Sequence, residues 1–303
     1  FMSQLSAEEC GVFQEKLFKF PGFYIQRRTI RQYSYNAAAH ALGDIGEVSA
    51  KDMEADEEGY YIRGDYIGKL GVERSYEKYL RGEKGVEILL RDAHGRIQGR
   101  YMDGEYDRPS IPGKNLTLSL DIDLQILGER LLKNKIGSIV AIEPETGEIL
   151  CLVSSPNYDP HLMIGRQRGK NHLMLQRDKQ KPLLNRALMG VYPPGSTFKT
   201  ASIMVALEDG KITPDYIVDT GNGQKPMHGR VMKDHNWHRG GYGKLTVTEI
   251  LGVSSNVGTS SIIENFYGSN PQKFVDGLKR MSIDQPLHLQ ISGEGKPNIR
   301  GPK

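Results

Sequence analysis

The stretch Val191-Tyr192-Pro193-Pro194-Gly195-Ser196-Thr197-Phe198-Lys199-Thr200 decides how this chain is interpreted. Its prolines and glycine break the chain just before a segment that is typical of a helix and stops at Gly210. Ser196 therefore lies at a helix start, and Lys199 follows one turn later on the same face. A serine hydroxyl is a weak nucleophile until a base takes its proton, and the positive end of a helix dipole favours both an alkoxide and an uncharged lysine. The stretch therefore predicts a nucleophilic serine with a lysine base.

The spacing of serine and lysine is weak evidence by itself, because about one such match is expected by chance in a chain of this length. The chain carries a second match, Ser75-Tyr76-Glu77-Lys78, in a segment whose apolar spacing predicts an exposed helix. There we expect Glu77 to compete for the lysine, and we do not expect Ser75 to be a nucleophile. For Ser196 the alternative is a capped core helix without chemistry.

A second pair of polar residues, Ser254 and Asn256, stands at the start of another predicted helix. A hydroxyl can relay a proton to a leaving amine, and a carboxamide can hold both a lysine and a substrate amide. Ser155-Pro156-Asn157 has the same spacing but follows a strand in a proline-rich segment, and we interpret it as a turn. The segment 234–238, with His228 nearby, could suggest a metal, but no cysteine lies close by and we interpret it as a solvated loop.

Composition excludes several classes of protein. The chain has 303 residues, about two domains at roughly 150 residues each. Its mean hydropathy is −0.49, and no apolar run approaches the roughly 18 residues of a membrane helix. A net charge of +3 is too balanced to argue for nucleic acid. Two cysteines, Cys10 and Cys151, exclude a disulfide scaffold and a four-cysteine zinc site.

The order of the expected elements predicts an α+β fold. Prolines and a glycine at 108–115 indicate a connector, which divides the chain into residues 1–112 and 113–303. Before it we expect a strand at 26–31, short helices at 36–42 and 71–80, and a strand at 87–92 that enters a hairpin. After it we expect a strand at 116–120, a helix at 124–132 capped by Asp121 or Asp123, a hairpin of strands 138–142 and 149–153, and helices at 202–207 and 248–265.

Taken together, the motif around Ser196 and the later Ser254-Ser255-Asn256 resemble the first two motifs of the penicillin-binding proteins. Residues 118–125 resemble the approach to their transpeptidase domain, and residues 138–150 with 155–160 resemble its opening hairpin. Residues 27–46 and 70–82 resemble the non-catalytic N-terminal module of class B members. Residues 69–73 are nearer to the elongation type, penicillin-binding protein 2, than to the division type. The resemblance implies an elongated, pedestal-like or dimerisation-like module at 1–112 and a transpeptidase domain at 113–303 whose C-terminal part is missing.

The resemblance implies a peptidoglycan D,D-transpeptidase that cross-links stem peptides ending in D-Ala-D-Ala. Ser196 would be the acylated nucleophile and Lys199 its base, while Ser254 and Asn256 would form the second motif. β-Lactams would mimic the dipeptide and trap Ser196 as an acyl-enzyme. No metal or organic cofactor is implied. A third motif, lysine followed by threonine or serine and then glycine, is absent from the sequence, so we expect the chain to end before it and to be impaired.

The resemblance also implies a location and partners. The catalytic domain would lie on the periplasmic side of the cytoplasmic (inner) membrane, held there by an anchor outside this chain. The partners implied are a membrane glycosyltransferase and proteins of the elongation complex, and nucleic acid is not among them. The alternatives are a division-type class B protein, a β-lactamase, a non-enzymatic β-lactam sensor, and a structural module whose serine–lysine pair is accidental.

Overall fold

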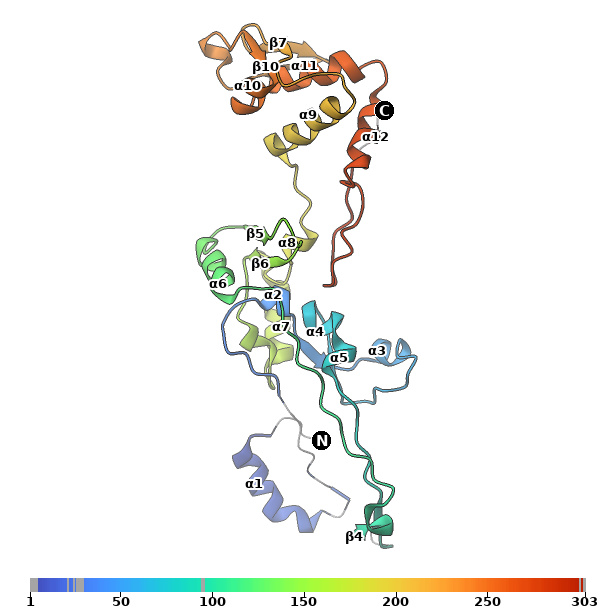
Figure 1. Ribbon diagram of the computed structural model, residues 1–303. Coiled ribbons are helices and arrows are strands. Elements are labelled where there is room, and N and C mark those ends of the chain that lie inside the picture. Colours follow the sequence, from blue (N-terminus) through green and yellow to red (C-terminus); the bar gives the residue numbers. More distant parts are fainter. Residues whose placement is uncertain are drawn as a thin grey trace. The chain divides into compact units, whose positions relative to one another are not determined.

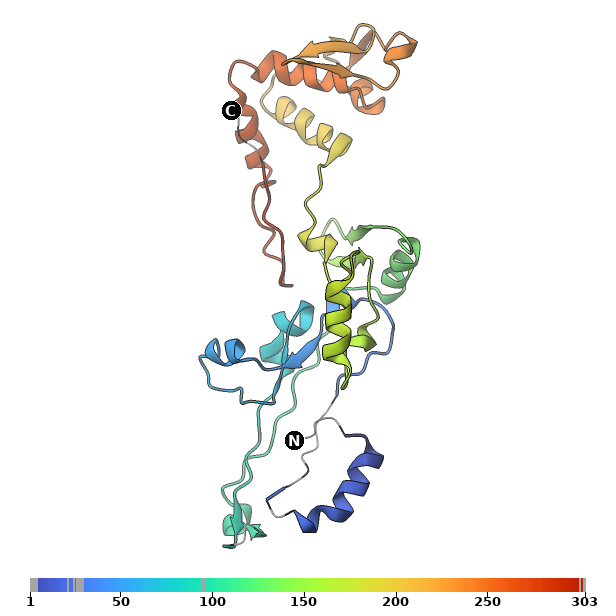
Figure 2. The same ribbon diagram turned by 180° about the vertical axis from the view of Figure 1, so that it is seen from behind.

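The computed structural model describes residues 5–20, 22–23, 25, 30–93, 96–299 and 301 (Figures 1 and 2). It comprises two compact units, one formed by residues 1–190 with 288–294 and the other by residues 191–287 with 295–303. Both contain helices and antiparallel strand pairs, so the predicted α+β class is confirmed. The strand predicted at 26–31 falls mostly outside the described residues. The predicted division at residues 112 and 113 stays a prediction.

The first unit contains three two-stranded antiparallel sheets, β1–β2, β3–β4 and β5–β6, among the residues that the structure describes. Its elements are α1 (Ala7–Lys16), η1 (Leu17–Lys19), α2 (Ala39–Leu42), β1 (Ile45–Glu47), α3 (Ala50–Glu54), β2 (Tyr66–Gly68), α4 (Gly71–Ser75), α5 (Glu77–Leu80), β3 (Leu89–Arg91), β4 (Ile97–Arg100), η2 (Tyr101–Gly104), α6 (Ile122–Leu131), β5 (Gly137–Ile142), β6 (Ile149–Ser155), η3 (Pro160–Met163), α7 (Arg168–Arg177) and α8 (Arg186–Met189).

Several local predictions for this unit are confirmed. The Asp121 carboxylate accepts hydrogen bonds from the amides of Asp123 and Leu124, so Asp121 is the cap of α6. The hairpin β5–β6 forms in antiparallel register, with Val140 opposite Leu152. The hairpin β3–β4 also forms, although its turn at residues 94 and 95 lies outside the described residues.

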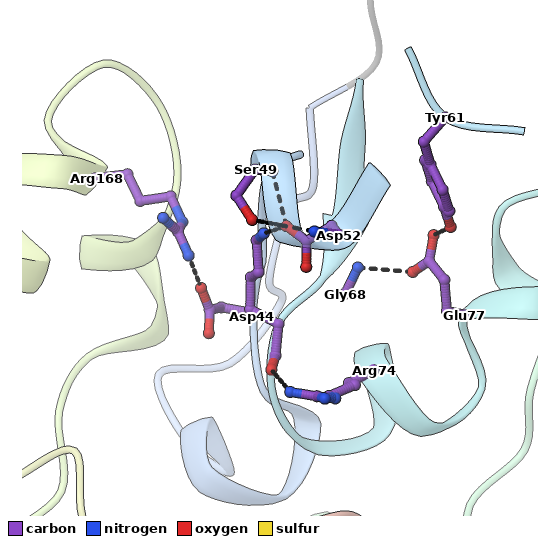
Figure 3. Close-up of polar contacts among 9 residues, drawn as sticks. Asp44, Ser49, Asp52, Tyr61, Gly68, Arg74, Glu77 and Arg168 are labelled. Carbon is purple, nitrogen blue, oxygen red and sulfur yellow. Dashed lines mark hydrogen bonds and ion pairs between the residues drawn. The ribbon is translucent and has the colours of Figure 1, made fainter. Parts of the chain in front are cut away.

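The helix predicted at 71–80 is instead two short helices, α4 and α5. The backbone of Tyr76 leaves the helical region, with φ −111° and ψ 16°. Glu77, the first residue of α5, accepts hydrogen bonds at 2.7 Å from the Tyr61 hydroxyl and from the Gly68 amide (Figure 3). These contacts orient α5 relative to β2, which a continuous helical pattern does not indicate.

The strand predicted at 116–120 is not a strand, because side chains already occupy the edge of β6 that it would join. Gln125 of α6 is 1% exposed, and its carboxamide accepts from the Leu152 amide at 2.8 Å and donates to the Leu152 carbonyl at 3.1 Å. The segment reaches β6 only at its end, where the Ser119 hydroxyl donates to the Ile149 carbonyl and the Asp121 amide to the Leu150 carbonyl.

Buried polar contacts join parts of this unit that are distant in sequence. Asp44 forms an ion pair with Arg168 of α7, 124 residues away (Figure 3). His40 of α2 is 9% exposed, and its Nε2 lies 2.7 Å from the Pro182 carbonyl, which can only accept, so Nε2 is the donor. Burial lowers the pKa of His40 to about 4, against the hydrogen bond to Pro182, which favours the charged form.

The second unit is a group of helices with two short antiparallel strand pairs, β7–β10 and β8–β9, in its described part. Its elements are η4 (Gly195–Thr197), α9 (Phe198–Glu208), β7 (Ile217–Asp219), β8 (Gln224–Met227), β9 (Arg230–Lys233), η5 (Trp237–Arg239), β10 (Lys244–Thr246), α10 (Val247–Gly252), α11 (Asn256–Tyr267) and α12 (Pro271–Arg280). In no described helix is the apolar stretch long enough to cross a membrane.

The core of the second unit lies where α9 packs against α11 and α12. Ile203 and Val205 of α9 and Ile262 of α11 are among its most buried side chains. The helices approach closely at Gly277 of α12, where an added Cβ would lie 2.3 Å from Val205 Cγ1. This packing fixes the axis of α9, at whose start Ser196 lies.

The helix predicted at 248–265 is two helices, α10 and α11, because residues 253–255 form a turn between them. Ser254 has a left-handed backbone with φ +55°, which ends a helix and is uncommon for a residue with a side chain. The Ser255 hydroxyl then caps α11 by accepting from the Gly258 amide at 2.8 Å. The break between α10 and α11 thus lies within the motif Ser254-Ser255-Asn256.

Candidate active site

Ser196 lies in the 3₁₀ turn η4 that leads directly into α9, so its predicted place at a helix start is confirmed. The turn begins at Gly195, whose φ of +62° is the left-handed conformation that favours glycine. The Ser196 side chain is exposed, as a nucleophile must be. Lys199, in the first turn of α9, places its Nζ 3.3 Å from Ser196 Oγ.

Lys199 is also bound to Ser254, which is 55 residues away in sequence. Its Nζ donates to the Ser254 carbonyl at 2.6 Å and to Ser254 Oγ at 2.9 Å. The left-handed turn at Ser254 presents both oxygens to the same nitrogen. The structure therefore brings together three of the predicted site residues, because Ser196 and Ser254 both contact Lys199.

Asn256, the fourth predicted site residue, is the first residue of α11. Its Nδ2 donates to the Lys233 carbonyl at the end of β9, at 2.7 Å. Among the described contacts the carboxamide holds β9 rather than Lys199. Its predicted role in binding substrate stays a prediction.

The environment of Lys199 favours its uncharged form. Burial lowers the pKa of the Lys199 ammonium, and the negative charge of Asp234 opposes this effect. An amine with a lowered pKa is uncharged in a larger fraction of molecules near neutral pH, and only that form accepts a proton. The site therefore contains a candidate base next to a candidate nucleophile.

Asp234 is the residue that the sequence interpretation missed. It is 1% exposed, so the prediction of a solvated loop at 234–238 is wrong at this position. Its carboxylate accepts from the Ser255 hydroxyl, with oxygen–oxygen distances of 3.0 and 2.9 Å, and from the Val257 amide at 2.9 Å. These partners lie 21 and 23 residues away, so no local pattern indicates them. No described group of three or more histidine, cysteine, aspartate or glutamate side chains could hold a metal ion.

The two segments that share the spacing of the site motifs, 75–78 and 155–157, have structural partners of their own. Lys78 donates to Glu58 at 2.6 Å, and Ser75 Oγ accepts from the Ser292 amide at 3.0 Å. The competitor for Lys78 is thus Glu58, and the prediction of Glu77 in that role is wrong. Ser155 Oγ bonds the carbonyls of Leu132 and Lys135, in keeping with a structural turn.

The sequence matches two family models over most of its length. Residues 1–118 match the penicillin-binding protein dimerisation domain, and residues 137–299 match the penicillin-binding protein transpeptidase domain. The chain belongs to the penicillin-binding proteins. The second match contains Ser196, Lys199, Ser254 and Asn256, and the pair of domains confirms the predicted class B membership.

Curated relatives match most of this chain within longer sequences of their own. Peptidoglycan D,D-transpeptidase MrdA of Acinetobacter baumannii is 39% identical over 252 residues, which is 82% of this chain and 37% of the relative. MrdA of Escherichia coli K12 is 34% identical, over 84% of this chain and 40% of the relative, whereas FtsI of the same strain is 29% identical, over 92% and 42%. The chain thus spans about two fifths of the length of these relatives.

Solved structures of PBP2 proteins also match the fold of this chain. A complex of PBP2 and MreC from Helicobacter pylori matches with a TM-score of 0.79 and 26% identity, over 96% of this chain and 53% of that chain. PBP2 of Pseudomonas aeruginosa in complex with WCK 5153 matches with a TM-score of 0.73 and 28% identity, over 88% and 54%. The MrdA and PBP2 relatives confirm the predicted resemblance to the elongation type.

Proposed function

We propose that the whole protein is a peptidoglycan D,D-transpeptidase of the elongation type, and that Ser196 is its acylated nucleophile. The observation that carries this proposal is the set of polar contacts that Lys199 Nζ makes with Ser196 Oγ, Ser254 Oγ and the Ser254 carbonyl. It lies within the region that matches the transpeptidase domain. The higher identity to MrdA than to FtsI of the same E. coli strain favours the elongation type over the division type.

The contacts of Lys199 suit an uncharged amine that acts as a base. Such an amine has two hydrogens and one lone pair. The short contacts to the Ser254 carbonyl and Oγ, at 2.6 and 2.9 Å, can take the two hydrogens. The lone pair then faces Ser196 Oγ, at 3.3 Å, and accepts the serine proton as the reaction begins.

Acylation then follows from these positions. Ser196 Oγ attacks the carbonyl carbon of the penultimate D-Ala while its proton passes to Lys199. The tetrahedral intermediate collapses by breaking the peptide C–N bond, and the leaving amine takes a proton from Ser254 Oγ, which is replenished from Lys199. The last D-Ala leaves, and Ser196 carries the acyl group as an ester. An amine of a neighbouring stem peptide attacks this ester, which forms the cross-link and returns the proton to Ser196.

The family likeness also suggests where the protein acts and what it binds. We place the site on the periplasmic side of the cytoplasmic membrane, with stem peptides as substrates and β-lactams as inhibitors. PBP2 of H. pylori forms a complex with MreC, and PBP2 of P. aeruginosa forms one with WCK 5153. By this likeness we expect elongation-complex proteins and a membrane glycosyltransferase as partners, with membrane attachment through a part of the protein outside these residues.

Labelling with a fluorescent penicillin tests the assignment in the whole protein. Ser196→Ala should abolish the labelling because the acyl group has no acceptor oxygen. Ser75→Ala is the matched control, since it removes the serine of the second serine–lysine match, at residues 75–78. This variant should label like the wild type. Equal labelling of Ser196→Ala and wild type would exclude Ser196 as the nucleophile. Rapid release of the label as hydrolysed penicillin would favour a β-lactamase instead.

A further inference from the structure

The turn at residues 253–255 needs an anchor, because its backbone is not one that a serine adopts readily. Ser254 has φ +55°, and a left-handed residue other than glycine or asparagine is unfavourable by about 1 kcal/mol. The surrounding structure must therefore hold it. Two residues that follow it, Ser255 and Val257, both donate to one carboxylate, that of Asp234.

Asp234 is buried without a cation in direct contact. It is 1% exposed, and the described residues place no lysine, arginine or histidine within ion-pair distance of it. Among the described contacts, its carboxylate accepts from the neutral Ser255 hydroxyl and the Val257 amide, at the start of α11. A buried carboxylate is unfavourable unless it is compensated, so its place beside this turn calls for an explanation.

We propose that Asp234 is a positioning residue of this active site, which fixes the left-handed turn so that both Ser254 oxygens face Lys199. The negative charge of Asp234 also acts on Lys199 and opposes the effect of burial on its pKa. This inference rests on the proposed function. Among the described contacts, η4 supplies Ser196 and the 253–255 turn supplies Ser254 as partners of Lys199. The loop after β9 supplies Asp234, which bonds the neighbouring Ser255 and acts on Lys199 through its charge. Among these groups, Asp234 is the one that carries a charge.

Two substitutions separate the charge from the anchoring. Asp234→Asn removes the charge but keeps an oxygen that can accept from Val257 and Ser255. Ser255→Ala keeps the charge and removes one anchor, together with the cap of α11. Thr246→Ala is the matched control because it removes the capping hydroxyl of α10, which bonds Glu249 and lies outside the Asp234 contacts.

The first measurement is the protonation midpoint of Lys199 in the 303-residue chain, from NMR of isotopically labelled lysines, with the signal assigned by its loss in Lys199→Ala. Asp234→Asn should lower the midpoint, since a nearby negative charge favours the ammonium. The control Thr246→Ala should leave it unchanged. An unchanged midpoint in folded Asp234→Asn would overturn the electrostatic part of the proposal.

The second measurement is the pH dependence of acylation by penicillin in the whole protein. Asp234→Asn should move the midpoint of the rate profile to lower pH by the same amount, whereas a loss of stability alone lowers the rate without moving the midpoint. Ser255→Ala should lower the maximal rate about tenfold relative to Thr246→Ala, and equal rates would overturn the anchoring role. If Asp234→Asn does not fold, the comparison of the maximal rates of Ser255→Ala and Thr246→Ala decides the anchoring role. If Ser196→Ala still labels, the proposed function fails, while the lysine midpoint still decides the electrostatic part of the inference.

Discussion

Protonation of His40 should destabilise the first unit as the pH falls. The folded protein holds the pKa of this buried imidazole at about 4, whereas an unfolded histidine has a pKa of about 6.5. Because the unfolded chain binds the proton more tightly, the stabilisation is fully present above pH 6.5 and is lost as the pH falls towards 4. At about 1.4 kcal/mol per pKa unit, the free energy of unfolding should fall by about 3 kcal/mol between pH 7 and pH 4 on account of His40.

The substitution His40→Gln isolates this effect, because glutamine does not titrate and its amide can donate to the same Pro182 carbonyl. Hydrogen exchange of peptides from α2 and β6, at several urea concentrations between pH 7 and pH 4, measures the stability of this unit. The variant should be less stable than wild type at pH 7 but should lose about 3 kcal/mol less on acidification.

Other groups that titrate in this range do so in both proteins and cancel in the comparison. The pKa of exposed His161 is raised, chiefly by its hydrogen bond with Asp159, so any contribution from it has the opposite sign. The pKa of Asp52 is lowered to about 2, where the contacts with Lys69 and Ser49 outweigh its burial, so it titrates below this range. Parallel pH profiles for wild type and His40→Gln would refute the reasoning.

Three further outcomes are expected. Lys199→Ala should slow penicillin acylation of the whole protein by about 10²–10⁴ in a stopped-flow assay, because the serine loses its base; an unchanged rate would exclude Lys199 as the base. Gly277→Ala should lower the free energy of unfolding by about 1–3 kcal/mol because its Cβ would overlap Val205. The control Gly252→Ala, which has open space around it, should not lower it, and equal melting temperatures of the two variants would contradict this packing. Because the sequence lacks the third motif, these 303 residues should be acylated at least about 10²-fold more slowly than E. coli MrdA, by intact-mass spectrometry; equal rates would show that the motif is dispensable for acylation.

Features coded by neighbouring residues could be predicted from the sequence. Pro193, Pro194 and Gly195 end one segment and begin another, so the place of Ser196 at the start of α9 follows from three adjacent residues. The cap of α6 at Asp121 and the hairpin β5–β6 follow from patterns of similar length. In each case the partners that form the structure lie within one motif.

Features that depend on distant partners could not be predicted in this way. The helical pattern at 248–265 gives no sign of the turn at Ser254, and the nearby Ser255 and Val257 bond a carboxylate more than twenty residues earlier in the chain. Asp234 lies in a run of polar residues that is typical of a solvated loop, and only the fold buries it. The alternating pattern at 116–120 is typical of a strand, but pairing also requires a free neighbouring edge, which the pattern does not report.

The Gln125 carboxamide has a consequence for how the folded first unit meets other molecules. It presents to Leu152 the same donor and acceptor that a neighbouring backbone would present, so another strand cannot pair with β6 at this residue. Strands with unmet amides and carbonyls are the sites where proteins join edge to edge into aggregates. One buried side chain thus closes the edge of β6 at Leu152, and we expect it to hinder edge-to-edge association there without a third strand.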